Sequence, residues 1–490
     1  MKLKIKDVNF LTGGPFVSII NKNDAQEIDL HPGDRILIKK NGKKVISVVD
    51  FSENHFIKRG EIGLFDEVLN NLGGKKGYVN INLAQRLKSL GYIKKKLEGK
   101  KLNKKEIFEI IKDINSNNLN EAELTYFVSG CYSHGLDMTE IEYLTESIVK
   151  VGHKLNLKRH PIVDKHSIGG IPGNRTTMVV VPIIASLGFT IPKTSSRAIS
   201  SPAGTADTME ALANVSFEVR DIEKIVEKTN ACMVWGGGVD LASADDKMIK
   251  VRNPLRLDPH GLLLASIMAK KKAVNASHVL IDIPLGNGAK IESLIEAVKL
   301  KRKFTELGKK LRIKIKVIIT DGKQPIGNGV GPNLEAIDVL KVLMGDGPKD
   351  LMNKSIKMST IILKMLKIKD AKKKVLDSLN SGKAYEKMKE IIKAQKGNIF
   401  RPEQLKYGKF RKDIHSTRNG KVKKIDNKDV SKIARMSGAP ADKTAGIYLN
   451  KKLKDKVKKG ELLFTVYSDS KKRLDYALEM IKERNPYIIS

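Results

Sequence analysis

Between about residues 160 and 395, short apolar runs alternate with longer stretches of helical period. Three runs have the length and β-branched content of buried strands: TTMVVVPII (176–184), HVLIDIP (278–284) and IKVIITDG (315–322). Residues 291–311, by contrast, repeat apolar side chains at helical spacing. Parallel strands need a long crossover between them, most often a helix. The alternation therefore predicts a central α/β domain with a mixed or parallel sheet.

The segments on either side have different patterns. Residues 1–84 alternate polar and apolar side chains between glycine turns, residues 85–155 are helical in pattern, and residues 399–490 return to strands before a closing helix. We expect a multidomain α/β chain. It comprises a small β-rich N-terminal domain (1–84), a helical domain (85–155), the central α/β domain (156–398) and a β-rich, α+β C-terminal domain (399–490).

The charge of the chain is strongly basic but unevenly spread. The 490 residues include 91 Lys and Arg against 55 Asp and Glu, a formal net charge of +36. Residues 161–300 nevertheless carry 16 basic and 14 acidic side chains, whereas residues 401–490 carry 24 and 11. A nucleic-acid binder concentrates its basic residues beside aromatic platforms. We therefore expect solvated basic faces and no specific nucleic-acid partner, with a polyanion-binding protein as the alternative.

Composition also indicates where in the cell the protein is expected to work. No run of about 18 apolar residues is present, and the N-terminus lacks the apolar core of a signal peptide. The two cysteines, Cys131 and Cys232, are too few for a disulfide framework or a thiolate metal site. We expect a cytoplasmic protein with no membrane partner.

The densest polar motif is DKHSIGGIPGNRT, residues 164–176. Its adjacent glycines allow backbone N–H groups to approach an oxyanion, and Lys165, His166 and Ser167 add charge and hydrogen-bond donors. The motif predicts an anion cradle that begins the α/β phosphate-binding domain. A purely structural strand-to-helix turn is the alternative.

A second motif, KTSSRAISSPAGTADTME, covers residues 193–210. Five hydroxyl-bearing side chains surround Arg197, and Asp207 and Glu210 follow at positions that can open a helix. So many small donors around one guanidinium suit phosphate or ribose oxygens. A serine-rich loop without a ligand is the alternative.

Together the motifs resemble the thymidine and pyrimidine-nucleoside phosphorylase family, in which a Lys-His-Ser-x-Gly-Gly phosphate loop precedes a Ser-x-Arg…Gly-Thr-x-Asp-x-x-Glu signature. Residues 243–271 form a third matching stretch, and the resemblance extends over about residues 85–490. It implies that residues 243–272 pack onto the helical domain, which faces the α/β domain across a cleft. It also implies a homodimer, and in one archaeal branch larger homo-oligomers.

The resemblance, with the cradle chemistry, assigns the site residues. Phosphate is expected against Lys165, Ser167, Gly169, Gly170, Thr176, Ser195 and Thr205, with His166 as a catalytic residue close to the sugar. The base is expected against Arg252, Ser266 and Lys270.

Two departures from the common family pattern point to that archaeal branch. The stretch usually read as Ser-Gly-Arg-Gly-Leu-Gly-His-Thr-Gly-Gly-Thr is SSRAISSPAGT (195–205), and the usual Gly-Val-Gly-Asp is replaced by GIPGN (170–174). With the extra N-terminal domain, these changes resemble proteins that phosphorolyse nucleoside 5′-monophosphates such as AMP, CMP and UMP to base and ribose 1,5-bisphosphate. A 5′-phosphate requires a second anion site. We assign it to Ser196, Arg197, Ala198, Ile199, Ser200 and Ser201, with Lys290 as a distal clamp; a plain surface lysine is the alternative for Lys290.

Departure of the base calls for a general acid, because protonating the leaving nitrogen stabilises it. The resemblance makes Asp258 that proton donor, and the leucines around it would raise its pKa by disfavouring the charged form. His260 is the rival acid, and a structural Asp-Pro turn is the alternative for Asp258.

Cofactor motifs are missing from the sequence. Gly327-x-Gly329-x-Gly331 lacks the GxGxxG spacing of a dinucleotide site, and no metal-ligand cluster is evident. We expect no metal and no organic cofactor, with inorganic phosphate as co-substrate and a small-molecule nucleotide as substrate. The runner-up function is an ordinary thymidine or uridine phosphorylase, which would prefer nucleosides to their 5′-monophosphates.

Overall fold

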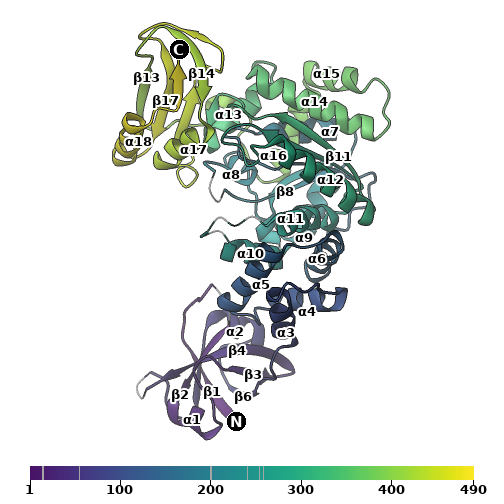
Figure 1. Cartoon of the computed structure of the whole chain (residues 1–490), viewed down its shortest axis with the longest axis vertical. Helices are drawn as coiled ribbons and strands as arrows, with labels where there is room; N and C mark the ends of the chain where they lie inside the picture. The colour runs from purple at the N-terminus through teal and green to yellow at the C-terminus, as the bar shows by residue number, and fades with distance from the viewer. Residues whose placement is uncertain are drawn as a thin grey trace. The chain divides into compact units, whose positions relative to one another are not determined.

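The computed structural model describes residues 1–13, 16–53, 56–198, 201–239, 241–252, 254–255, 257 and 259–490. The chain divides into two compact units (Figure 1). The first unit comprises Met1–Gly152 and Ser243–Ser266, and the second His153–Ala242 and Ile267–Ser490. The multidomain α/β class expected from the sequence is confirmed, and the finer domain boundaries stay predictions.

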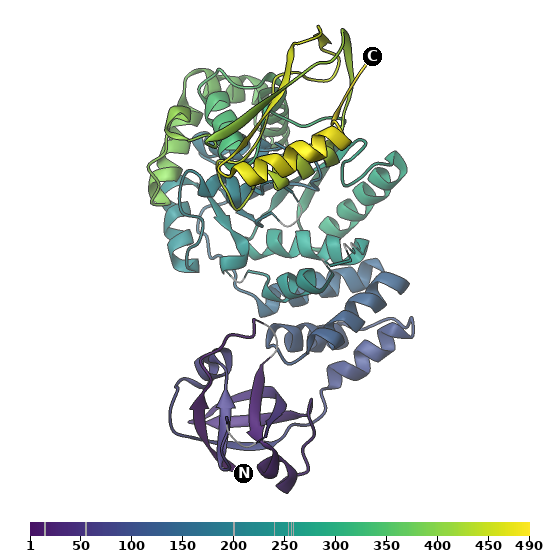
Figure 2. The same cartoon turned by 90° about the vertical axis from the view of Figure 1, so that its left-hand side faces the viewer.

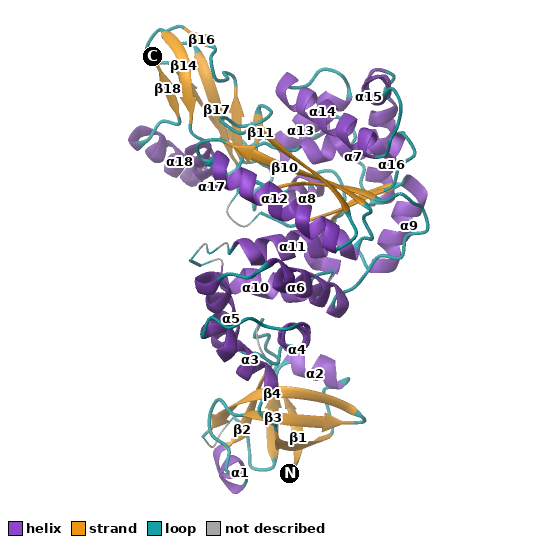
Figure 3. Cartoon of the chain, turned by 45° about the vertical axis from the view of Figure 1, so that its right-hand side comes forward, coloured by secondary structure: helices purple, strands orange, loops and turns teal. Residues whose placement is uncertain are grey.

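The first unit begins with a closed barrel whose strand order is β1-β5-β2-β4-β3-β6 (Figure 3). Its elements are β1 (Lys2–Asp7), β2 (Val17–Asn21), α1 (Lys22–Glu27), β3 (Arg35–Lys40), β4 (Lys43–Ser52), β5 (Glu61–Leu64), α2 (Asp66–Leu72) and β6 (Tyr78–Leu83). The pairs β1/β5 and β2/β4 are parallel. Alternate residues such as Leu3, Ile36 and Ile38 fill the interior, as the strand period of two requires.

Helices make up the rest of the first unit: α3 (Lys88–Leu97), α4 (Lys104–Asn115), α5 (Glu121–His134), α6 (Met138–Val151), α10 (Ser243–Arg252) and the first part of α11 (His260–Ala273). Asn103, Asn120 and Asp137 cap α4, α5 and α6, and in each case a glutamate three residues later returns the hydrogen bond. These capping boxes satisfy backbone N–H groups that a helix leaves unpaired at its start.

A parallel sheet lies at the centre of the second unit. Strands β7 (Val163–Ser167), β10 (His278–Leu285) and β11 (Lys314–Asp321) are ordered β11-β10-β7 and run parallel. Strands β8 (Ile191–Ser195) and β9 (Ala231–Trp235) form a second parallel pair. The strands predicted at 278–284 and 315–322 are confirmed.

The helical and 3₁₀ elements of this central part are α7 (Thr176–Ser186), α8 (Thr205–Glu210), α9 (Val219–Thr229), η1 (Gly236–Val239), the second part of α11, α12 (Leu294–Lys310), α13 (Pro332–Leu343), α14 (Lys349–Met365), α15 (Ala371–Asn380), α16 (Lys383–Ala394) and η2 (Pro402–Gln404). Helix α7 corrects the sequence analysis, because residues 176–184 were predicted as a strand. The whole of Thr176–Ala185 is buried, and α7 packs against α14 and α16. A run that is apolar on every side carries no period, so it does not distinguish a buried helix from a buried strand.

The C-terminal part of the second unit is built from β12 (Gly329–Val330), β13 (Phe410–His415), β14 (Gly420–Ile425), α17 (Asn427–Met436), β15 (Gly446–Leu449), β16 (Lys456–Val457), β17 (Leu462–Ser468), α18 (Lys471–Glu483) and β18 (Tyr487–Ile489). One sheet has the order β12-β15-β17-β13, another β16-β14-β18. Helix α18 packs across the strands (Figure 2). Within the described residues, no helix is long and apolar enough to cross a membrane.

Candidate active site

The first motif lies at the carboxyl end of β7. Ser167 is the last residue of that strand, and it is paired in register with Asp282 of β10. Residues 168–175 then lead into α7. Open α/β sheets bind ligands outside the carboxyl ends of their strands, where loops can close around them. The motif therefore lies at an edge where a parallel sheet offers a binding site.

Two adjacent glycines shape the start of this loop. Gly169 and Gly170 have φ values of 96° and 90°, a region that residues with a Cβ rarely adopt. A Cβ on Gly170 would lie 2.2 Å from the backbone nitrogen of Lys290, so a side chain does not fit there. The close approach brings the backbone that carries Lys290 against the predicted phosphate loop, although the binding role of the exposed Lys290 side chain stays a prediction.

Lys165, in the middle of β7, is fully buried. Its Nζ donates to Thr177 Oγ1 at 3.2 Å. Burial lowers the pKa of Lys165 to about 7; Asp282 opposes the shift, and the charges of Lys354 and Arg175 add to it. A buried amine of this kind gains strongly from an adjacent anion, because the anion stabilises the charged form. Lys165 can therefore bind an oxyanion and take up a proton as it does so.

Ser167 belongs to a hydrogen-bond network that crosses the sheet. Its Oγ donates to Asp282 Oδ2 at 2.9 Å and accepts from Asn174 Nδ2 at 3.3 Å. Thr320 of β11 donates to the other Asp282 oxygen at 2.6 Å, and Thr176 donates to Asn174. The predicted phosphate contacts Ser167 and Thr176 are thus connected through Asn174.

A second buried carboxylate, Asp164, precedes Lys165. Lys271 donates to its Oδ2 at 2.5 Å, and Lys193 Nζ lies 3.4 Å from its Oδ1. Burial alone would raise the pKa of Asp164, but the two lysines hold it below its usual value. Burial and the same lysine charges hold the pKa of the neighbouring His166 well below its usual value. His166 is therefore neutral at pH 7 and can exchange hydrogen bonds without adding charge.

The second motif is held together by its own charged residues. The Arg197 guanidinium donates to both oxygens of Glu210, at 2.8 and 2.6 Å, and lies over the Trp235 ring with 4.9 Å to the centroid. Asp207 Oδ2 accepts from the backbone nitrogen of Ala198 at 2.6 Å. Arg197 therefore holds the loop in this structure, and its contact with a 5′-phosphate stays a prediction.

The serines of the second motif differ in their surroundings. Ser195 Oγ is buried and has no hydrogen-bond partner among the described residues, so a ligand oxygen could satisfy it. Ser196 is exposed, and Ser201 donates to a nearby backbone carbonyl at 3.1 Å. Ile199 and Ser200 lie outside the described residues.

Arg175 joins the two motifs and was missed by sequence reasoning. It donates to Thr205 Oγ1 at 3.0 Å and to the carbonyl of Ala203 at 3.1 Å, and it pairs with the buried Glu335. Burial raises the pKa of Glu335, although Arg175 opposes the shift. The only sequence signal for Arg175 was its place within the first motif.

Sequence reasoning also missed Asp282, because it lay in a predicted strand without any motif of its own.

The predicted base contacts lie on α10 and α11. In the first unit, Ser266 donates to the buried Asp245 at 2.6 Å, and Arg252 is 6% exposed. Within the described part of the chain, Arg252 Nη1 has no hydrogen-bond partner, which leaves a donor for a ligand. Lys270 follows Ser266 by one turn of α11. Asp258, the predicted proton donor, lies outside the described residues.

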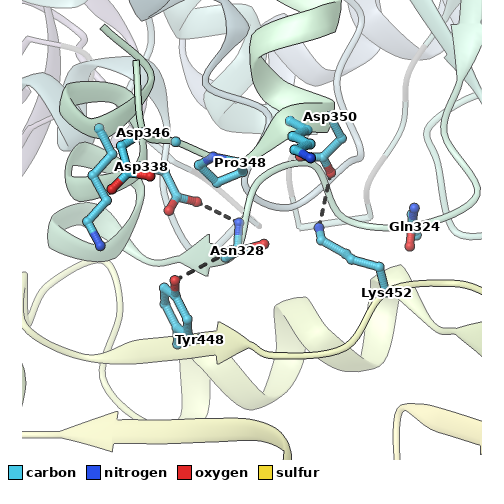
Figure 4. A pocket seen from close by; sticks show the side chains of 11 residues that line it. Gln324, Asn328, Asp338, Asp346, Pro348, Asp350, Tyr448 and Lys452 are labelled. Carbon is cyan, nitrogen blue, oxygen red and sulfur yellow. Dashed lines mark hydrogen bonds and ion pairs between the residues drawn. The ribbon is translucent and has the colours of Figure 1, made fainter. Parts of the chain in front are cut away.

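A pocket of about 470 Å³ is lined by residues between Gln324 and Asp350 and by Tyr448 and Lys452 of the C-terminal part (Figure 4). Asp350 pairs with Lys452 at 3.1 Å, and Asn328 Nδ2 donates to the Tyr448 hydroxyl at 3.4 Å. Asp338 accepts from the backbone nitrogen of Asn328 at 2.6 Å. The contacts of Lys452 and Tyr448 attach the C-terminal part to the central part. Over the described residues, no group of three or more His, Cys, Asp or Glu could hold a metal ion.

Three family models match successive parts of the chain. They are the helical bundle domain of the glycosyl transferase family (residues 90–152), its a/b domain (159–385) and the pyrimidine nucleoside phosphorylase C-terminal domain (421–487). Among solved structures, anthranilate phosphoribosyltransferase from Thermus thermophilus matches with a TM-score of 0.52 and 16% identity, covering 62% of this chain and 99% of that one. At such identity the likeness concerns the fold alone.

Curated relatives match over nearly the whole chain. AMP phosphorylase of Methanocaldococcus jannaschii is 45% identical over 98% of this chain and 96% of its own length. AMP phosphorylases of Pyrococcus furiosus and Pyrococcus horikoshii are 46% and 48% identical, each over 99% of this chain and 97% of their own lengths. The chain therefore belongs to the AMP phosphorylase family, whose domains are those of the pyrimidine nucleoside phosphorylases.

Proposed function

We propose that this protein catalyses the phosphate-dependent cleavage of nucleoside 5′-monophosphates, AMP foremost and also CMP and UMP, to free base and ribose 1,5-bisphosphate. The observation that carries the proposal is the cradle at the end of β7. There the strand holds the buried amine of Lys165, with its pKa of about 7, and ends in the hydroxyl-bearing Ser167, which the adjacent Gly169 and Gly170 at positive φ follow closely. Such a site favours a small oxyanion.

In the proposed reaction, an oxygen of the cradled phosphate attacks C1′ of the ribose. A new C1′–O bond forms and the C1′–N bond breaks, with its electron pair passing to the base nitrogen, which takes a proton from Asp258. Positioning and electrostatic stabilisation supply most of the acceleration, since the ribosyl centre becomes oxocarbenium-like as the base departs. Arg252, Ser266 and Lys270 are the proposed base contacts, as the family resemblance implies, and a neutral His166 contacts the sugar.

The 5′-phosphate is the feature that separates this function from nucleoside phosphorolysis. We assign it to Lys290 and to the hydroxyl-bearing loop that Arg197 holds in place. Lys290 is well situated for this role because its backbone lies directly against Gly170 of the phosphate cradle.

We further propose that the enzyme works in the cytoplasm as a homodimer or larger homo-oligomer, on free nucleotide and phosphate. The free, buried thiols of Cys131 and Cys232 agree with a reducing compartment.

The test is to incubate the protein with AMP, CMP, UMP, adenosine, thymidine and uridine, with and without phosphate, and to measure free base. We expect release that requires phosphate and is at least about tenfold faster from AMP than from any nucleoside, since a lost charged contact costs more than about 1.4 kcal/mol. Preference for uridine or thymidine would instead favour a pyrimidine-nucleoside phosphorylase.

A further inference from the structure

Lys354, on α14, is a buried cation next to the phosphate cradle. Its side chain is 10% exposed, and its Nζ lies 3.1 Å from Oδ2 of Asp282. The same Oδ2 accepts the hydrogen bond from Ser167. Lys354 is therefore separated from a predicted phosphate contact by one shared carboxylate oxygen.

Asp282 needs a counter-charge in this position. It is fully buried, and Ser167 and Thr320 each donate to one of its oxygens. A negative charge directly behind an anion site repels the anion, and this repulsion is weakly screened away from water. In the described part of the chain, Lys354 is the residue that forms an ion pair with Asp282.

We propose that Lys354 is a positioning residue for phosphate binding, which holds the Asp282 carboxylate in place and neutralises its charge, so that Asp282 does not repel an anion bound at the cradle of Lys165. The proposal rests on the proposed function only in taking phosphate as the ligand of the cradle. It differs from a direct phosphate contact, because Lys354 acts through Asp282.

The charges around the two lysines add a pH-dependent consequence. The groups that face them, from every element packed against them, are Asp164, Arg175, Asp282, Asp321 and Asp350. In addition, the positive charge of Lys354 lowers the pKa of Lys165. Removal of Lys354 should therefore raise that pKa and shift the loss of anion affinity to higher pH.

The experiment compares Lys354→Met, Lys354→Gln and Lys354→Arg with Lys357→Met, a matched control at an exposed position one turn along α14. Phosphate binding is measured by calorimetry without nucleotide, and KM is determined separately for phosphate and AMP. We expect Met and Gln to weaken phosphate binding about tenfold or more, as for loss of one buried charge interaction, and to change KM for AMP less than about twofold. Arginine should recover most of the affinity, and the control should match wild type.

A double-mutant cycle tests whether Lys354 acts through Asp282. Asp282→Asn removes the charge and keeps the shape, so in the Lys354→Met background it should restore much of the lost phosphate affinity. Restoration, together with the shifted pH profile, supports the proposal.

Equal phosphate affinity of Lys354→Met and Lys357→Met would overturn it. So would an equal rise in both KM values that Asp282→Asn does not reduce, because Lys354 would then only support the fold. If wild type binds phosphate but releases no base from AMP, the proposed function fails and this inference stands. If wild type does not bind phosphate, the inference itself fails.

Discussion

At the scale of the residue, the buried charged groups of the cradle differ in whether they have an ion-pair partner. Asp164 is balanced by Lys193 and Lys271, whereas Lys165 has no carboxylate within hydrogen-bond reach among the described residues and donates to Thr177 instead. Burial is the main reason that its pKa falls to about 7, and the charge of Asp282 opposes the shift. A bound phosphate would supply the close negative charge that Lys165 lacks among the described residues.

Anion affinity should consequently fall as the pH rises through about 7. Below that pH Lys165 is protonated, and above it an anion must bind together with a proton. Sulfate, which does not titrate in this range, should bind about tenfold more weakly at pH 8 than at pH 6. His166, with its pKa already well below the usual value, contributes little to this change.

Calorimetry with sulfate measures the effect, and buffers of different ionisation enthalpy count the protons taken up. Lys165→Met should bind weakly at both pH values, without the pH dependence. A wild-type affinity that stays constant from pH 6 to pH 8 would contradict the assignment of Lys165 as the titrating group.

At the scale of the element, the adjacent Gly169 and Gly170 of the loop between β7 and α7 are needed for different reasons. Both have positive φ, but of these two residues it is Gly170 that lies against other backbone; a Cβ on Gly169 would meet nothing within 4 Å. The sequence marked the pair as a cradle, but the separate function of each glycine depends on the loop after β10, which is more than 100 residues away.

Gly170→Ala should therefore be far more damaging than Gly169→Ala. At Gly169 the cost is the backbone strain of about 1–2 kcal/mol for a residue at positive φ. At Gly170 the Cβ must also displace the backbone at Lys290, so we expect phosphate binding to fall by at least about tenfold more. Thermal unfolding and phosphate calorimetry on both variants measure the difference, and equal losses would show that contact with Lys290 is unimportant.

At the scale of the whole molecule, the C-terminal part supports the loops at the carboxyl edge of the central sheet. Asn427, fully buried at the start of α17, donates to the carbonyls of Asn287 and Gly322 at 3.2 and 2.9 Å. One of these carbonyls lies in the loop that continues to Lys290. The Asn427 side chain thus connects the C-terminal part to the loop whose backbone at Lys290 lies against Gly170.

Asn427→Asp should destabilise the protein by about 3 kcal/mol or more, because it places an unpaired carboxylate against two carbonyls. We also expect a higher KM for phosphate through displacement of the loop. Lys428→Ala is the matched control: it removes an exposed ion pair with Glu292, so it should cost less than about 1 kcal/mol. Urea unfolding and phosphate kinetics compare the two, and similar behaviour would refute the role of Asn427.

The sequence by itself determined the strands of clear composition at 278–284 and 315–322 and the helix within 291–311. Each of these depends on residues close together in the chain. Only the tertiary structure decided that Thr176–Ser186 is a helix, since a segment buried on every side carries no period. It also decided that Ser167 donates to Asp282 and that Lys354 forms an ion pair with the same carboxylate. Both results depend on burial and on pairing between residues far apart in the chain, and the local sequence contains no information on either.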